Sequence, residues 1–345
     1  MLKTKTLGVF CPSKTDATSF YRGIGPMGAL RRQYERDNLQ LVFLNEVNWA
    51  TLKLLDYMFM QRPFTDSHLL MAKLAKRQSI PLWLDYDDLL FEVPEDNPVY
   101  DLYAPPKVHS NIQEMLSLAD VVSVSTPALA EQLSQYTNKC IVIRNAFDDF
   151  MFPYYGKNCM HKASMQKQQK LILWRGSNTH SADCDSVADS IISQAQKNPD
   201  WVWMFVGDNH WFTRYIPKSR RIVIKQPLDI YEYMQLIAQT HPTLMIVPLV
   251  DSTFNRCKSD CAWLEGTFAG ATVLAPEFQT EFAPDVCKKY SADNFDTTLE
   301  NLMNTSLTDL FAFRERAWQN LVDNRLLSKE KLRSAIIDHL WELRC

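Results

Sequence analysis

The chain has 345 residues, of which 46% are hydrophobic and 22% charged, and a formal net charge of −3. This length accommodates two domains that each bury a core, and the composition is that of a soluble globular protein. The negative charge excludes attachment to nucleic acid by bulk electrostatics, although it allows a local basic groove. No stretch reaches the roughly 20 apolar residues of a membrane span, and the N-terminus lacks a signal-peptide pattern, which predicts a cytoplasmic protein.

The first half of the chain alternates short apolar runs with amphipathic stretches. Because the apolar runs carry hydrophobic side chains on both faces, they predict buried strands of a parallel sheet. Amphipathic stretches at 67–75, 108–117 and 127–135 predict helices that cover this sheet. The strands are expected at 6–10, 41–43, 57–60, 82–85, 121–124 and 141–143.

A stretch without clear periodicity at 148–170 predicts an interdomain linker. The alternation then resumes, with strands expected at 171–174, 202–206, 222–224, 244–247 and 272–275. The fold class is therefore α/β, with two Rossmann-like, doubly wound parallel-sheet domains that face a central cleft. The first domain is expected over 1–150 and the second over 151–325. A C-terminal helix over 326–345 is expected to complete the first domain.

Two segments of the first half follow strand ends, where such sheets bind ligands. The loop at 16–26 contains Gly23 and Gly25 but lacks the spacing of the dinucleotide-binding fingerprint. The segment at 82–88 ends in Asp85, Asp87 and Asp88, three carboxylates that repel one another unless they are paired or solvated. Such a cluster can bind a divalent metal, an acceptor hydroxyl or a neighbouring arginine, or it can form a solvated turn.

The strand expected at 171–174 leads into a glycine turn. Gly176 permits close approach of the backbone to a ligand. Arg175 and Ser177 can donate hydrogen bonds to phosphate oxygens, and His180 is the histidine nearest to this turn. The position of the turn, at the first strand end of the second domain, favours a role in ligand binding.

The segment at 247–276 gives the strongest signal, because it reads as strand, loop, helix, glycine turn and strand. Ser259 is expected as the N-cap of the helix, and Lys258 and Glu265 share one helical stripe. A cation beside free N–H groups suits phosphate, and a carboxylate two turns on suits ribose hydroxyls. A surface helix with an ordinary charge pair is the alternative, and Asp260 adds an anion beside the proposed phosphate site.

The eight cysteines lack the paired spacing of a metal site. Cys257 and Cys261 stand four residues apart on an expected helix, and no second pair accompanies them. Free, mostly buried thiols are therefore expected, and no metal ligands.

Taken in order, these segments resemble the retaining, family-4-type glycosyltransferases of the GT-B fold, including short bacterial and phage relatives. The similarity spans residues 6–276. It rests on Tyr21-Arg22 with Pro26, Asp56 with Gln61-Arg62, Asp85 through Asp88, Ser123 through Thr126, residues 142–146, Trp174 through Ser177 with His180, Phe205 through Gly207, and Asn255 through Gly270.

The resemblance implies transfer of a sugar from a nucleotide-diphosphate donor to an acceptor hydroxyl, with UDP favoured over GDP, with retention, and without a metal or other cofactor. The implied catalytic residues are Arg175, Lys258 and Asp87. The implied donor-binding residues are Gly23, Gly25, Gly176, Ser177, His180, Asn255, Ser259 and Glu265, and Tyr21, Arg22, Asp85 and Asp88 lie on the acceptor side. The chain departs from the family at Cys257, where a first glutamate would touch the transferred sugar; Asn255 would supply a polar contact instead.

Two other functions stay open. Asp85-Tyr86-Asp87 also fits the DxD pattern with which GT-A glycosyltransferases bind a divalent metal. The missing first glutamate also fits a protein that binds nucleotide sugars without catalysis. The acceptor is a glycan or, as the phage relatives suggest, a modified DNA base, for which basic residues would line a groove. These are Arg31, Arg32, Lys218, Arg220 and Arg221. The sequence leaves the oligomeric state open.

Overall fold

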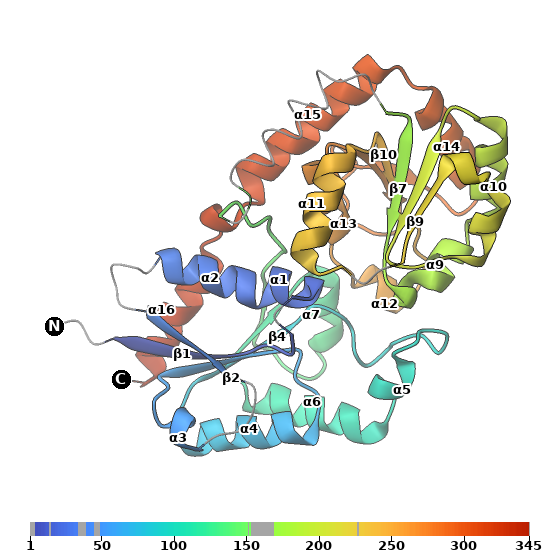
Figure 1. Ribbon diagram of the computed structural model, residues 1–345. Helices are drawn as coiled ribbons and strands as arrows, with labels where there is room; N and C mark the ends of the chain where they lie inside the picture. Colours follow the sequence, from blue (N-terminus) through green and yellow to red (C-terminus); the bar gives the residue numbers. More distant parts are fainter. Residues whose placement is uncertain are drawn as a thin grey trace.

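The computed structural model describes residues 4–13, 15–33, 39–44, 49–150, 152, 169–225 and 228–344. They form two lobes, each built on a six-stranded sheet (Figure 1). The strand orders are β2-β1-β3-β4-β5-β6 and β12-β11-β10-β7-β8-β9, and every strand pair in both sheets is parallel. The predicted α/β class with two doubly wound domains is confirmed.

The first sheet contains all six strands expected from the apolar runs. Its central strands β3 and β4 are buried along their whole length, as strands covered on both faces must be. The strands are β1 Lys5–Phe10, β2 Leu39–Leu44, β3 Tyr57–Gln61, β4 Leu82–Tyr86, β5 Val121–Val124 and β6 Cys140–Val142. The helices are α1 Ala17–Arg22, α2 Ile24–Gln33, α3 Trp49–Leu52, α4 Asp66–Arg77, α5 Tyr100–Tyr103, α6 Pro106–Leu118 and α7 Pro127–Leu133.

The second sheet contains the five expected strands and one more, β12 Lys288–Tyr290, whose polar sequence gave no strand signal. The other strands are β7 Leu171–Arg175, β8 Val202–Val206, β9 Arg221–Ile224, β10 Leu244–Ile246 and β11 Thr272–Pro276. Its helices are α9 Ser181–Asp185, α10 Ala188–Lys197, α11 Ile230–Thr240, α12 Thr253–Arg256, α13 Cys261–Ala269, α14 Phe295–Asn304 and α15 Leu307–Asn324. Short 3₁₀ turns at Asn178–His180 (η1), Trp211–Tyr215 (η2), Lys218–Arg220 (η3) and Leu327–Lys329 (η4) connect them.

The last helix, α16 Leu332–Arg344, returns to the first lobe (Figure 1). Ile336, Ile337 and Leu340 of this helix belong to the same hydrophobic cluster as residues of β1, β3 and β4. A bridge between Phe147 and Leu326 joins the chain after β6 to the approach to α16. The domain limits at 150/151 and 325/326 stay a prediction, since the expected linker lies largely outside the described residues.

The cysteines were expected to be free thiols, which is confirmed for the described ones, and Cys257 and Cys261 were expected on one helix, which is wrong. The six described cysteines, at 11, 140, 184, 257, 261 and 287, are free. The single helix that was expected to carry Cys257 and Cys261 is wrong, because Cys257 closes α12 and Cys261 opens α13. No helix within the described ranges is long and apolar enough to cross a membrane.

Replacing Ile337 by alanine is expected to lower the free energy of unfolding by about 2–5 kcal/mol, because this fully buried side chain would leave a cavity between α16 and the first sheet. Urea unfolding followed by circular dichroism would measure the loss. The matched control is Leu343→Ala, whose side chain is 54% exposed and should cost less than about 0.5 kcal/mol. Equal effects of the two variants would contradict the packing of α16 described above.

Candidate functional site

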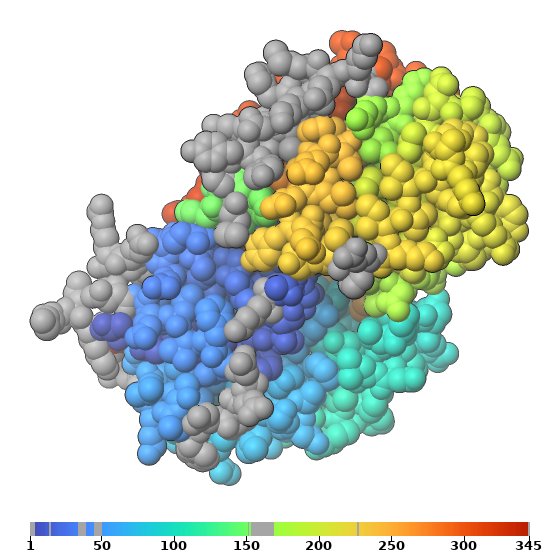
Figure 2. All heavy atoms as spheres, viewed as in Figure 1, coloured from blue at the N-terminus to red at the C-terminus, as the bar shows by residue number. Residues whose placement is uncertain are grey.

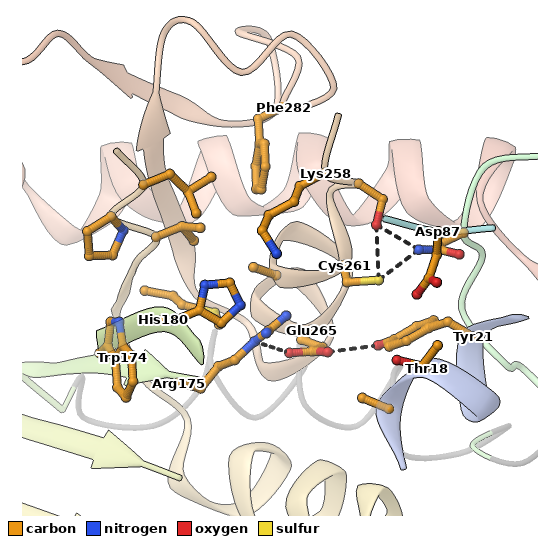
Figure 3. A pocket seen from close by; sticks show the side chains of 18 of the residues that line it. Thr18, Tyr21, Asp87, Trp174, Arg175, His180, Lys258, Cys261, Glu265 and Phe282 are labelled. Atoms are coloured by element: carbon orange, nitrogen blue, oxygen red, sulfur yellow. Dashed lines mark hydrogen bonds and ion pairs between the residues drawn. The ribbon is translucent and has the colours of Figure 1, made fainter. Parts of the chain in front are cut away.

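A cavity of about 850 Å³, part of it open to solvent, lies between the two lobes. Figure 2 shows the line along which the lobes meet, and Figure 3 shows the cavity from close by. Its walls come from α1 and the loops after β4 and β6 on one side, and from the ends of β7 and β10, η1 and the start of α13 on the other. The lining residues are Ala17, Thr18, Tyr21, Asp87, Asp88, Asn145, Trp174, Arg175, His180, Met245–Leu249, Lys258, Ser259, Cys261, Ala262, Glu265 and Phe282.

The carboxylate of Glu265 lies at the floor of this cavity and is only 2% exposed. Arg175 Nε lies 2.5 Å from Oε2, and the Tyr233 hydroxyl donates to the same oxygen at 2.9 Å. The Tyr21 hydroxyl, from the other lobe, donates to Oε1 at 3.2 Å (Figure 3). Burial and the nearby Glu265 charge raise the pKa of both tyrosines well above the usual value, so both hydroxyls stay protonated as donors. The structure thus brings Arg175, Glu265 and Tyr21 together.

The start of α13 forms the wall beside Glu265. Lys258 precedes the helix, so its expected place on a helical stripe is wrong, yet its side chain reaches the cavity and Nζ lies 3.7 Å from Asp88 Oδ1 across the cleft. The expected N-cap is also wrong. Asp260 holds that position without a side-chain cap, and Ser259 Oγ accepts a hydrogen bond from Asn145 Nδ2 at 2.7 Å instead.

Asp260, the anion that was expected beside the proposed phosphate site, is neutralised by Arg325. Asp260 is 2% exposed and binds Arg325 through two hydrogen bonds of 2.6 and 2.7 Å. The first N–H groups of a helix have no partner within the helix, and Cys261 and Ala262 line the cavity. The helix start, Lys258 and Arg175 therefore give this part of the cavity a positive character that suits an anionic ligand.

His180 lines the cavity from η1, and its ring is fixed by a residue that the sequence analysis did not single out. Asp183 Oδ2 lies 2.9 Å from His180 Nδ1. Oδ1 of the same carboxylate accepts from the Val250 amide at 2.9 Å and from Asn255 Nδ2 at 2.8 Å. The i, i+3 spacing of His180 and Asp183 is the only local signal of this arrangement. Asn255 lines a neighbouring cavity rather than the main one.

The three clustered aspartates lie in two environments, one shared by Asp87 and Asp88 and the other formed around Asp85. Arg62 donates to Asp87 at 2.8 and 2.7 Å and to Asp88 at 2.8 Å, and both carboxylates line the cavity. Asp85 is 1% exposed and binds the fully buried Arg22 through hydrogen bonds of 3.0 and 2.6 Å. The expectation that Arg22 and Asp85 face an acceptor is therefore corrected, because this pair lies in the interior of the first lobe.

The glycines at 23 and 25 serve packing and do not line the cavity. A Cβ on Gly23 would lie 2.4 Å from Cys11 Sγ, and one on Gly25 would lie 2.2 Å from the Phe20 carbonyl oxygen. The expected donor contacts of both glycines are corrected accordingly. Gly176 lies beside Gly207, whose φ of +106° and 2.3 Å clearance to the Gly176 carbonyl oxygen leave no space for a side chain.

Gly176 and Ser177, both expected to bind the donor, lie outside the cavity lining, as does Cys257. Ser177 is exposed, caps η1 and shares a hydrogen bond of 2.6 Å with Thr179 Oγ1. Cys257 is 1% exposed and packs with the hydrophobic core of the first lobe, while its carbonyl oxygen accepts from Thr126 Oγ1 at 2.8 Å. The side chain at the position of the family's first glutamate is thus buried away from the cavity.

Replacing Asp85 by alanine is expected to lower the free energy of unfolding by about 3–5 kcal/mol, because it leaves the Arg22 charge buried without its carboxylate partner. Thermal or urea unfolding would measure this loss. The control is Asp251→Ala, which removes a pair with Arg256 whose two side chains are both about half exposed and should cost about 1 kcal/mol or less. A loss of less than about 1 kcal/mol at Asp85 would contradict the buried pair.

Comparison with known proteins identifies the fold. No family model matches the sequence, and no curated protein matches it either. Among solved structures, sucrose-phosphate synthase from Thermosynechococcus elongatus is 10% identical with a TM-score of 0.68, covering 97% of this chain and 98% of that one. An Escherichia coli trehalose-6-phosphate protein bound with UDP-2-fluoro glucose is 12% identical (TM-score 0.65, 98% and 99% covered). Anabaena HepE in complex with UDP-glucose is 14% identical (TM-score 0.61, 99% of both covered). The chain therefore has the GT-B fold of these proteins.

Proposed function

We propose that the chain is a glycosyltransferase that moves a sugar from a nucleoside-diphosphate donor, with UDP favoured, to an acceptor hydroxyl. The observation that carries the proposal is the convergence of Arg175, Lys258 and the start of α13 with the Glu265 carboxylate in one cavity. Cations and helix N–H groups suit a diphosphate, and a buried carboxylate suits ribose hydroxyls. The similar structures from Escherichia coli and Anabaena hold UDP-2-fluoro glucose and UDP-glucose, which supports the same donor class here.

On this proposal, Glu265 accepts hydrogen bonds from the ribose. A carboxylate offers about four lone-pair sites, and the hydrogen bonds from Tyr21 and Tyr233 leave about two of them for ribose hydroxyls when Arg175 binds the diphosphate. Arg175 and Lys258 bind the diphosphate, and Lys258 exchanges its ion pair with Asp88 for a phosphate oxygen. The first-lobe residue Tyr21 closes the donor site from the opposite wall.

The chemical step follows from the charges around the diphosphate. The acceptor oxygen bonds to the sugar carbon as the bond between that carbon and the phosphate oxygen breaks. The electron pair of the broken bond goes to the departing nucleoside diphosphate, which takes up the proton that the acceptor hydroxyl releases. Arg175 and Lys258 stabilise this developing charge. Asp87 and Asp88 lie on the opposite wall, held by Arg62, where they face an acceptor. Retention of the anomeric configuration is part of this proposal because the sequence resembles the retaining, family-4-type glycosyltransferases.

A metal-dependent DxD site has less support than this arrangement. Asp85 is buried against Arg22, and Asp87 is bound by Arg62. The proposal is therefore a metal-independent transfer, in which the cations of the protein take the place of a metal.

A protein that binds nucleotide sugars without transferring them is the second candidate function. The observation that favours it is the burial of Cys257, which offers the cavity no polar group at the position of the family's first glutamate. Release of UDP from UDP-glucose at a steady rate would favour the enzyme. Binding of UDP-glucose without turnover over many hours would favour the binding protein.

For the acceptor, a glycan has more support than DNA. The guanidinium of Arg220 donates to the Ala195 carbonyl, and that of Arg221 donates to the Thr213 carbonyl, so both serve the fold. Arg32 stacks on Phe150. These contacts engage three of the five basic residues that were expected to line a groove, and the net charge of −3 adds no bulk attraction to a phosphate backbone.

UDP is expected to raise the melting temperature, because a ligand that binds only the folded state stabilises it by about 2.7 kcal/mol at 100 times its Kd. The shift should persist in EDTA and should be lost in Glu265→Ala. Differential scanning fluorimetry with UDP, GDP, ADP and NAD measures it, with the exposed Glu277→Ala as control. A shift that requires manganese would support the DxD site, and no nucleotide shift would refute the assigned donor site.

Lys258→Ala is expected to lower kcat by at least about tenfold, while the Kd for UDP rises by less, because the charge on the diphosphate grows in the transition state. Turnover of UDP-glucose with release of UDP gives kcat, and calorimetry gives Kd. Lys197→Ala, on α10 and outside the cavity lining, is the matched control. Small and equal changes of kcat and Kd would contradict the assigned role of Lys258.

A further inference from the structure

His180 and Asp183 form a pair at the wall of the cavity. The imidazole lines the cavity near the ends of the Arg175 and Lys258 side chains (Figure 3). Asp183 lies one turn later and is 7% exposed. Its carboxylate accepts three hydrogen bonds, from His180 Nδ1, the Val250 amide and Asn255 Nδ2, at 2.8–2.9 Å. These contacts fix both the carboxylate and the imidazole that it holds.

The pair determines which ring nitrogen carries the proton. Because a carboxylate is an acceptor, Nδ1 of His180 must be the donor, and a neutral ring then presents the lone pair of Nε2. Within the described part of the chain, no side chain or backbone group forms a hydrogen bond with Nε2 of His180. The lone pair is therefore available to a ligand in the cavity.

The charges around His180 favour the neutral ring. Arg175 on β7 and Lys258 before α13 face it as cations, whereas Asp183 on α9 and Asp88 after β4 face it as anions. Burial, followed by the Lys258 charge, lowers the pKa of His180, and the hydrogen bond with Asp183 opposes this shift. At neutral pH the ring is therefore uncharged, and it becomes a cation only as the pH falls through this lowered pKa.

A second cavity, of about 640 Å³, begins on the other side of the same wall. Residues Asn178, Thr179 and Asp183 line it together with Asp96 and Asn97 of the first lobe. Ser252, Asn255, Phe254, Pro94, Ala182 and Val250 complete its lining, which includes no lysine or arginine. Its lining combines amide, hydroxyl and carboxylate groups with apolar side chains and contains no cation, which disfavours a phosphate.

We propose that Asp183 is a positioning residue that holds His180 as its Nδ1–H tautomer, and that Nε2 accepts a hydrogen bond from a substrate hydroxyl. This inference rests on the proposed function and makes it more specific. On this proposal His180 does not bind phosphate together with Arg175 and Lys258, because a lone pair on Nε2 repels a phosphate oxygen. The hydroxyl belongs either to the sugar of the donor or to the acceptor, and the affinity for UDP-glucose and its rate of hydrolysis distinguish the two sources.

The variant Asp183→Asn tests the positioning role with little change of shape. The amide oxygen still accepts from the Val250 amide and from Asn255, whereas the NH₂ group replaces the oxygen that faces His180. Because that group can only donate, Nδ1 must become the acceptor and the proton must move to Nε2. Long-range ¹H–¹⁵N NMR of the histidines reports the tautomer directly, and the His180→Ala spectrum assigns the signal.

The expected result is an unprotonated Nε2 at pH 7.5 in the wild type and a protonated Nε2 in Asp183→Asn, with a melting temperature close to that of the wild type. A protonated Nε2 in the wild type, or the same tautomer in both proteins, would overturn the positioning role. The measurement needs no substrate. Should Asp183→Asn fail to fold, the wild-type tautomer alone still decides the point.

Calorimetry with UDP and UDP-glucose, together with hydrolysis of UDP-glucose, tests the hydroxyl contact. If the hydroxyl belongs to the donor sugar, His180→Ala loses about tenfold in affinity for UDP-glucose, the size of one hydrogen bond, and none for UDP. If it belongs to the acceptor, both affinities persist and hydrolysis, in which water takes the acceptor's place, slows by a similar factor.

The variant His180→Gln, which keeps an acceptor oxygen, should recover part of either loss. The wild-type rate should also fall on acidification, as Nε2 becomes protonated. Unchanged affinities and an unchanged rate in His180→Ala would overturn the hydroxyl contact. A wild type that binds neither UDP nor UDP-glucose would count against the proposed function instead, and the NMR result would still decide the role of Asp183.

Discussion

The arrangement of the site depends on one buried charge, the guanidinium of Arg22. This side chain is fully buried at the end of α1, and a buried charge is tolerated only when it is paired and hydrogen-bonded. Asp85 binds it through two hydrogen bonds, and the Ile143 carbonyl and Asn145 Oδ1 accept from Nη1. The pairing fixes α1, the end of β4 and the chain after β6 relative to one another. It thereby orients Asn145 toward the start of α13 and brings Tyr21 to Glu265.

The charges that line the cleft are paired with one another in the absence of a ligand. Arg175 binds Glu265, Lys258 approaches Asp88, and Arg62 holds Asp87 and Asp88. Pairs of this kind avoid isolated charges in a partly buried site, and the pair of Lys258 with Asp88 crosses from one lobe to the other. On the proposed function, a diphosphate takes over Arg175 and Lys258 in exchange for their protein anions, while Asp88 keeps its pair with Arg62 and Glu265 keeps the hydrogen bonds from Tyr21 and Tyr233. The Asp260 pair with Arg325 is not exposed to this exchange, because it lies behind the helix start.

The sequence by itself determined the fold class, and it singled out Arg175 and Lys258 as candidate cations for a phosphate. Strands buried on both faces show as continuous apolar runs, so the runs at 57–60 and 82–85 located β3 and β4 to within one residue. Arg175 ends β7 and Lys258 lies in the chain after β10, and the carboxyl ends of parallel strands gather at one edge of a sheet. Their assignment to one donor site with Glu265 came from the resemblance to the family-4-type glycosyltransferases. The strand β12 escaped prediction because its sequence, Lys-Lys-Tyr, carries no apolar run, and only its pairing with β11 makes it a strand.

Only the tertiary structure decided which polar residues face the cleft. Arg22 and Asp85 are separated by 63 positions, and no local pattern shows that they neutralise each other in the interior. The same holds for Asp183, which binds Asn255 across 72 positions, and for Cys257, whose side chain enters the core of the other lobe. Local periodicity reports how a segment lies on its own sheet. Whether a charge reaches the solvent, a partner or a ligand depends on which distant segment packs against it, and that is set by the folded chain as a whole.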